Sequence, residues 1–146
     1  MVHALERIHK LLRPDGSLID IHPSGDPPPI EVRVGSQVTC AGWLKETDDF
    51  IEYGQASAAL SQAIECGWFT VEREGTFEFI THADSLAQLR EYLAKEWKDA
   101  IIDESVAARA EELLNAPNRD KELTVRERIR IVRMRPVPPN PFTGDV

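Results

Sequence analysis

The sequence predicts an α/β or α+β fold in which helices pack on a small mixed sheet. Two patterns support this prediction: some segments carry apolar residues at helical spacing, and others carry them at every second position. The 146 residues, 42% hydrophobic and 29% charged, have ordinary globular composition and allow a sizeable core. We expect a single domain over residues 1–135 and a proline-rich tail over residues 136–146.

The N-terminal segment predicts a helix that leads into a short strand. Residues 2–12 place apolar side chains on one helical face, and Arg13-Pro14-Asp15-Gly16 then ends the helix with a turn. Residues 17–22 (SLIDIH) are apolar enough to form a largely buried strand. A loop is expected at 23–29 (PSGDPPP), because consecutive prolines exclude both helix and central strand.

A hairpin and a second helix are expected next. Residues 31–34 and 37–44 form the two arms of the hairpin, and Gly35-Ser36 is a two-residue connection of the kind that closes tight turns. Thr47-Asp48-Asp49 favours a helix start, because it combines a capping side chain with negative charge near the positive end of the helix dipole. This helix runs to about Glu65.

The second half predicts strand, helix and strand. Residues 68–80 alternate in polarity on both sides of Gly75, which indicates either a hairpin or one long strand with a bulge. Residues 83–115 form the main helical block, with a break expected near residues 102–104. Residues 124–134 form the last strand.

Composition excludes several classes of protein. The net charge of −8 opposes unspecific binding to nucleic acid or anionic lipid, so neither is an expected partner. The sequence holds no apolar run of membrane-spanning length and no apolar signal core, so we expect a cytoplasmic protein. Cys40 and Cys66 form no CxxC motif and are expected to be small buried residues in a reducing compartment.

Residues 4–21, ALERIHKLLRPDGSLIDI, resemble the late part of a class I S-adenosylmethionine-dependent methyltransferase. In that family a helix reading like "hREIhRvLkPGGrLll" leads into the fifth strand of a doubly wound sheet. Residues 8–16 match this pattern, with Asp15 in place of the first glycine of the turn. The resemblance therefore implies the second half of such a sheet.

The resemblance also assigns the later elements. The strands at 68–80 and 124–134 correspond to the antiparallel sixth and seventh strands, and the hairpin at 30–44 and the helices at 83–115 are insertions. The family's cofactor site, a glycine-rich turn and an acidic strand end, precedes the matching segment, and only three residues precede Ala4 here. The chain contains no GxGxG, so we expect no S-adenosylmethionine site and no bound cofactor.

Three functions remain open at this stage. The first is a non-catalytic methyltransferase-like domain that acts through self-association, as a homodimer, or through another protein partner. The second is a small-molecule-binding protein with an aromatic pocket near the end of strand 17–22. The third, an enzyme in its own right, has the least support, because Ser57 and Ser61 lack a GxSxG elbow and no catalytic residue is assigned.

Candidate ligand-binding residues follow from position and pattern. His22 ends a strand, where α/β sheets commonly bind ligands, and His82 follows a strand in the same way. For each, a structural histidine is the preferred alternative. His9 is expected on the surface, and Asp20, inside an apolar strand, needs a partner or solvent. No HxH or HxxxH pair occurs, so we expect no metal site. The full candidate set is His22, Trp43, Tyr53, Trp68, His82, Arg126, Arg128 and Arg130.

The arginines and aromatics in this set each have a plain structural alternative. The tryptophans and tyrosine either line an apolar pocket or belong to the core. The three arginines recur at every second position of the last strand and share one face, where they bind an anion or pair across strands. The expected cross-strand partners are Glu72, Glu74 and Glu78.

Overall fold

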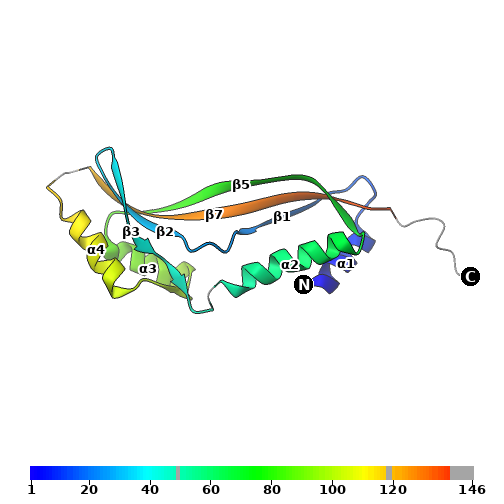
Figure 1. Cartoon of the computed structure of the whole chain (residues 1–146), viewed down its shortest axis with the longest axis horizontal. Coiled ribbons are helices and arrows are strands. Elements are labelled where there is room, and N and C mark those ends of the chain that lie inside the picture. The colour runs from blue at the N-terminus through cyan, green and yellow to red at the C-terminus, as the bar shows by residue number, and fades with distance from the viewer. Residues whose placement is uncertain (49, 118–119, 139–146) are drawn as a thin grey trace, which may run out of the picture. The chain divides into compact units, whose positions relative to one another are not determined.

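The computed structural model describes residues 1–48, 50–117 and 120–138 (Figure 1). Within these residues it shows a mixed α+β fold with four helices, a mainly antiparallel five-stranded sheet and a separate two-stranded sheet, which confirms the predicted combination of helices with a small sheet. The elements are α1 (Val2–Leu11), β1 (Leu18–Pro23), β2 (Pro29–Val34), β3 (Gln37–Trp43), β4 (Lys45–Glu46), α2 (Ile51–Glu65), β5 (Phe69–Ala83), α3 (Leu86–Glu96), β6 (Ala100–Ile101), α4 (Glu104–Leu114) and β7 (Lys121–Pro136).

The chain divides into two compact units. The first unit comprises Met1–His22, Glu52–Thr76 and Arg130–Val146, and the second comprises Pro23–Ile51 and Phe77–Ile129. Strands β5 and β7 contribute residues to both units. The single domain over 1–135 stays a prediction, and of the predicted tail only residues 136–138 lie within the described part of the chain.

The first unit is built from α1, α2, β1 and parts of β5 and β7. Its core contains Leu5 from α1, Leu60 from α2, Phe69 from β5, and Val132 and Met134 from β7. Small side chains on α2 let that helix lie close to the rest of this core; they are Ala59 and Ala63. Strand β1 pairs with β7 alone among the described strands, so β1 is an edge of the sheet.

The C-terminus of α2 explains how the chain turns from helix to strand. Gly67 adopts a left-handed φ of 73°. Its N–H donates to Ile64 O at 2.9 Å, and Trp68 N–H donates to Ala63 O at 3.1 Å, which is the Schellman arrangement. The predicted stop at Cys66-Gly67 is thereby confirmed, and it directs Phe69 into the core of the first unit.

The second unit contains the hairpin and the two later helices. Strands β2 and β3 pair antiparallel around Gly35, whose φ of 61° suits the tight connection, so the predicted hairpin is confirmed. Strand β2 also pairs antiparallel with β7. Leucines of α3 and alanines of α4 pack against the apolar face of these strands in one core cluster. Its fully buried members include Ile30, Val32, Leu44, Leu89, Ala110 and Leu123.

Three expectations differ from the structure. The segment around Gly75 is one continuous strand, β5, so the hairpin alternative was wrong. The helical block at 83–115 is two helices, and the break between them contains β6, which pairs with β4. Cys40 and Cys66 are both exposed free thiols, because each lies at a solvent-facing position of β3 or the α2 terminus, so the expected burial was wrong.

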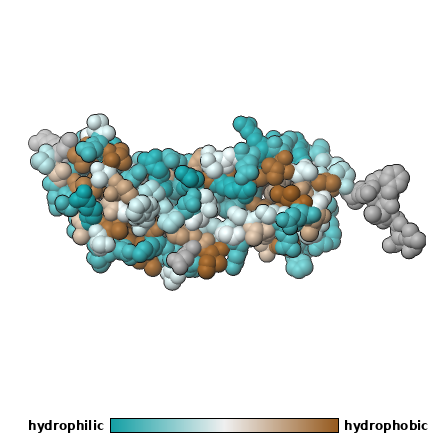
Figure 2. Space-filling model, in the orientation of Figure 1, coloured by the Kyte–Doolittle hydropathy of each residue, from teal (hydrophilic) through white to brown (hydrophobic). Residues whose placement is uncertain are grey.

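No helix in the described residues is long and apolar enough to cross a membrane. In the view of Figure 2, hydrophobic residues form small patches that hydrophilic residues separate. Within the same described ranges, no cluster of three or more histidine, cysteine, aspartate or glutamate residues could hold a metal ion.

Candidate functional site

A cluster of three polar side chains in the first unit connects β1 to α2 through hydrogen bonds. Asp20 and His22 are two residues apart on β1, so their side chains lie on the same face of the strand. His22 Nδ1 lies 2.5 Å from Asp20 Oδ2, and His22 Nε2 lies 3.1 Å from Ser57 Oγ. The side chain of His22 is 10% exposed and that of Asp20 is 21% exposed. The pairing expected for Asp20 is therefore confirmed, with histidine as its partner.

The two contacts of the His22 ring suit one tautomer of the imidazole. With Asp20 ionised, the imidazole donates its Nδ1 proton to the carboxylate, which fixes the tautomer and the ring orientation. Nε2 then carries a lone pair and accepts the Ser57 hydroxyl proton. A carboxylate, an imidazole and a hydroxyl linked in this order form the arrangement that activates a nucleophilic serine.

The helix surface beside Ser57 is open. Gly54 lies three residues before Ser57 and therefore on the same side of α2. No heavy atom lies within 4 Å of the position that a Cβ on Gly54 would occupy. Glycine inside a helix costs roughly 1 kcal/mol relative to alanine, and packing does not require it here. Space is therefore available next to the hydroxyl.

A cavity of about 460 Å³ lies elsewhere in the first unit. It has apolar walls and a polar rim, and its lining includes Leu12, Pro14, Trp68, Pro136, His9 and Lys10. Trp68 is the single residue of the predicted candidate set in this lining. Because neither His22 nor Tyr53 contributes to it, this cavity is not the pocket expected at the end of strand 17–22.

His9, expected on the surface, is instead half-buried at this cavity. Its Nε2 lies 2.8 Å from Val137 O, and its ring meets that of Phe69 edge-on, with centroids 5.4 Å apart. Lys10 forms an ion pair with Glu6 at 2.6 Å, one helical turn away. The cavity rim is therefore held by contacts between α1 and the end of β7.

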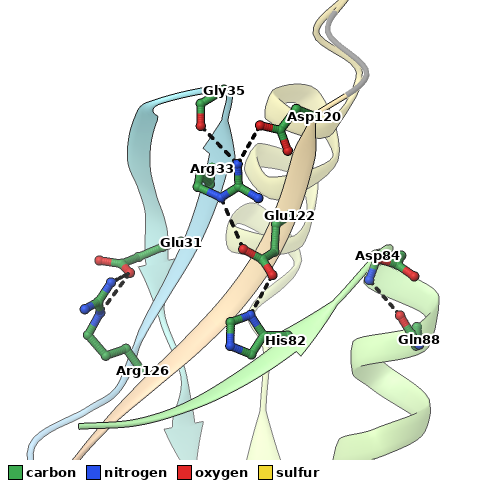
Figure 3. Close-up of polar contacts among 9 residues, drawn as sticks. All are labelled: Glu31, Arg33, Gly35, His82, Asp84, Gln88, Asp120, Glu122 and Arg126. Atoms are coloured by element: carbon green, nitrogen blue, oxygen red, sulfur yellow. Dashed lines mark hydrogen bonds and ion pairs between the residues drawn. The ribbon is translucent and has the colours of Figure 1, made fainter.

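The arginine row of β7 is paired with carboxylates. In the second unit Arg126 lies between Glu31 and Glu78, at 2.9 and 2.7 Å (Figure 3 shows the Glu31 contact). The hydrogen bonds that Arg126 donates to Glu78 and then to Glu31 raise the pKa of its guanidinium. Arg128 pairs with Asp26 at 3.6 Å. In the first unit Arg130 pairs with Glu74 at 2.8 Å.

These pairs settle the cross-strand expectation. It is confirmed for Arg126 with Glu78 and for Arg130 with Glu74. It was wrong for Glu72, whose partners are Arg133 and Arg135, farther along β7. Alternation placed the arginines on one face, but the register between β5 and β7 decides which carboxylate each arginine meets.

A second ionic network surrounds Glu122 in the second unit (Figure 3). Its carboxylate bridges His82 Nδ1 at 2.6 Å and Arg33 Nε at 3.2 Å, and Arg33 also contacts Asp120 at 2.9 Å. The hydrogen bond from His82, followed by that from Arg33, lowers the pKa of Glu122. His82 is 58% exposed, so this network lies on the surface and its net stabilisation is small.

A buried carboxylate also occurs in the second unit. Glu46 on β4 accepts a hydrogen bond from Trp97 Nε1 at 2.5 Å. Burial, and then the negative charge of Glu46, raise the pKa of Glu127 on β7. Sequence reasoning did not single out either glutamate.

The predicted candidates divide between the two units. His22, Tyr53, Trp68 and Arg130 belong to the first unit, and Trp43, His82, Arg126 and Arg128 belong to the second. Trp43 is 59% exposed at the end of β3, and Tyr53 is half-buried on α2. The structure brings none of the three aromatic candidates together around one cavity.

Ser57 is the residue that sequence reasoning missed. It was set aside because it has no GxSxG elbow, yet it lies within hydrogen-bond distance of His22. The available signal was the DIH triplet, which predicts a carboxylate and an imidazole on one strand face. Their third partner comes from a helix 35 residues away, and spacing does not identify it.

Comparisons with known proteins give no relative for this chain: no protein-family model, no curated protein and no solved structure matches it. The local geometry therefore carries the functional argument.

Proposed function

We propose that this chain is a methyltransferase-like association module that does not methylate on its own and that self-associates through β1. The observation that carries this proposal is the exposure of β1. Ile19 and Ile21, which alternate with Asp20 and His22, are each 57% exposed. They therefore occupy the face of β1 that is turned away from Ser57 and α2.

An edge strand with exposed apolar side chains favours pairing with another strand. The unpaired N–H and C=O groups of β1 offer backbone hydrogen bonds, and the two isoleucines add apolar area to bury. Natural edge strands are usually protected by charges, prolines or a covering element. On β1 the residue that limits pairing is Pro23, at the very end of the strand.

The turn before β1 supports the methyltransferase-like part of the proposal. Gly16 N–H donates to Arg13 O at 2.8 Å, and a Cβ on Gly16 would lie 2.9 Å from that same oxygen. A glycine is therefore needed at this second position of the turn, whereas Asp15 occupies the first. Strand β7 pairs with both β1 and β5, as expected if these are the last three strands of such a sheet.

A second copy of this chain is the partner that we favour. Closed two-fold dimers are the commonest soluble assemblies, and a two-fold axis beside β1 would pair the strand with itself. The pairing would also bury the four isoleucines of the two copies against each other. Another protein that offers an apolar strand edge is the alternative partner.

Charge substitution on β1 tests the proposal. The double variant Ile19→Lys and Ile21→Lys should convert a dimer into a monomer of 16.4 kDa in sedimentation experiments, because like charges would then face each other across the strand edge. The matched control is Val38→Lys, since Val38 is 51% exposed on β3, another strand with a single pairing partner. A wild-type monomer, or dissociation by Val38→Lys alone, would refute association through β1.

The cavity beside Trp68 supports a second candidate function, small-molecule binding. Its volume of about 460 Å³ is within the range of ligand sites, and its apolar walls suit a flat apolar ligand, since Lys10 in the lining is already paired with Glu6. Indole is a suitable probe. Saturable heat in a calorimetric titration that Trp68→Ala abolishes would support this function, and absence of heat with wild type would reject it for this class of ligand.

The absence of a cofactor site has its own test. The isolated chain should give no saturable heat with S-adenosylmethionine, because it has no glycine-rich turn for close backbone approach to the cofactor. A dissociation constant in the micromolar range would contradict the methyltransferase-like half-sheet.

A further inference from the structure

We propose that Ser57 is a nucleophile, activated by His22 and positioned through Asp20, and that this site hydrolyses small activated carboxylic esters. The proposal is independent of association through β1, because Asp20 and His22 lie on the opposite face of that strand from the exposed isoleucines.

The geometry is that of an activated hydroxyl. The two ring nitrogens of His22 contact different partners, with the carboxylate at 2.5 Å and the hydroxyl at 3.1 Å. Both distances are within the reach required between a base, its orienting group and a nucleophile. Asp20 touches the imidazole and not the hydroxyl in these contacts, so it is a positioning residue.

Burial strengthens the carboxylate–imidazole contact. Only 10% of the His22 side chain is exposed, so water competes weakly for its hydrogen bonds. When His22 accepts a proton, the resulting imidazolium lies directly against the Asp20 carboxylate. This charge-assisted pair favours removal of the hydroxyl proton.

The turn of α2 before Ser57 is open at Gly54, which is the approach that we propose for a small substrate. Side chains in a helix lean toward the N-terminal end, so the Ser57 hydroxyl lies over the turn that contains Gly54. The absence of a side chain at Gly54, together with the open space around it, leaves that turn uncovered. A side chain at this position would occupy the approach to the hydroxyl.

The reaction uses water as its second reactant. Ser57 Oγ attacks the ester carbonyl carbon while its proton passes to His22 Nε2. The bond from carbon to the leaving oxygen then breaks, and that oxygen takes the proton from Nε2. In the second half, water attacks the acyl-serine, gives a proton to Nε2, and releases the carboxylic acid as Ser57 recovers its proton from Nε2.

The helix sets a limit on the rate and on the substrate class. Ser57 lies in the interior of α2 (Ile51–Glu65), where backbone N–H groups are already bonded within the helix and do not serve as oxyanion donors. Losing one oxyanion donor costs about 10²–10³ in rate in enzymes that have one. We therefore expect turnover only of esters with good leaving groups, of which p-nitrophenyl acetate is the simplest probe.

The test combines covalent labelling with turnover by the full chain. A fluorophosphonate probe should add to the wild-type protein, and peptide mass spectrometry should place the adduct on Ser57. Ser57→Ala should lower both labelling and p-nitrophenyl acetate hydrolysis to background. Ser61→Ala is the matched control, because Ser61 is an exposed serine one turn later on the same helix, and it should keep both.

Two further variants separate catalysis from structure. His22→Ala should lose hydrolysis at least tenfold. Added imidazole should restore part of it above the rate that the same imidazole gives with Ser57→Ala, which a merely structural histidine would not do. Gly54→Leu should keep α2 helical and lower labelling of Ser57 by filling the approach. Absence of an adduct on Ser57 in the wild-type protein, or an adduct confined to another residue, would overturn the proposal without requiring any variant to fold.

Discussion

The two compact units differ in the size of their cores. In the second unit, α3 and α4 pack on the strands around a cluster that includes fully buried Leu89 and Leu123, while Phe77 and Phe79 of β5 stay exposed. The first unit has a smaller buried cluster, and Ile19 and Ile21 of β1 stay exposed. The first unit also holds the Trp68 cavity and the Asp20–His22–Ser57 cluster. Both of these candidate sites therefore lie in the unit with the smaller core.

Core truncation tests this difference with the largest expected effect. Leu89→Ala should lower the free energy of unfolding by about 4 kcal/mol, and Leu60→Ala by about 3 kcal/mol, because Leu60 belongs to the smaller of the two buried clusters. Chemical denaturation measures both values. A larger loss for Leu60→Ala would reverse the comparison of the two cores.

A glycine pair tests how tightly the second unit is packed. At Gly42 a Cβ would lie 2.4 Å from Val106 Cγ2, and the φ of 156° already disfavours a side chain. Gly42→Ala should therefore cost about 2–3 kcal/mol of unfolding free energy. Gly75→Ala is the control, since a Cβ there meets nothing within 4 Å, and thermal denaturation should show little change. Equal losses of unfolding free energy in Gly42→Ala and Gly75→Ala would show that β3 and α4 can move apart to admit a side chain without loss of stability.

Much of the fold was predictable because its signals are local. Gly35 and Gly67 mark the hairpin and the end of α2, and both adopt the left-handed conformation that such turns need. Gly75 gave an ambiguous signal, because alternation on both sides of a glycine fits a hairpin and a continuous strand equally well. Only the pairing of β5 with β7 decides between them.

The candidate site was predictable in part for the same reason. Asp20 and His22 share a strand, so their contact follows from local alternation. Ser57 reaches His22 through packing of α2 on β1, and the partners of Glu72 depend on the register between two strands. Such long-range relations leave no fixed spacing in one sequence.

Ion pairs on β7 give a smaller effect that compares the units directly. Arg126→Gln should lower the free energy of unfolding by about 1 kcal/mol, because Arg126 bridges two carboxylates. Arg130→Gln should lower it by about 0.3 kcal/mol, because Arg130 pairs with one carboxylate in the described part of the chain. Both losses should shrink in 1 M salt, where charges are screened. A salt-independent loss would point to packing of the arginine stem instead.

Another small effect depends on pH. The folded protein holds the Glu127 proton more tightly than the unfolded chain, because its pKa is raised above 4.5 by burial and by Glu46. Stability contributed by this group is therefore lost as pH rises through the raised pKa. Glu127→Gln should stabilise the protein by about 0.5 kcal/mol at pH 7 and by nothing near pH 4.

Glu122 on the same strand is the control with the opposite sign. Its pKa is lowered by His82 and Arg33, so Glu122→Gln should destabilise the protein at pH 7. The difference should shrink as pH falls below 4.5 and disappear below the lowered pKa. Urea titrations at the two pH values measure both variants. Equal signs for Glu127→Gln and Glu122→Gln at pH 7 would contradict the assigned causes.

Hydrogen exchange along β1 tests the central claim, association through the uncovered edge of the first unit, most directly. Exchange of the Leu18–His22 amides should slow when the protein is concentrated from about 1 μM to about 100 μM, because a second copy then pairs with the strand. Amides of β3, another strand with a single pairing partner, should exchange equally at both concentrations. Concentration-independent exchange along β1, or slowing on β3 alone, would contradict the account.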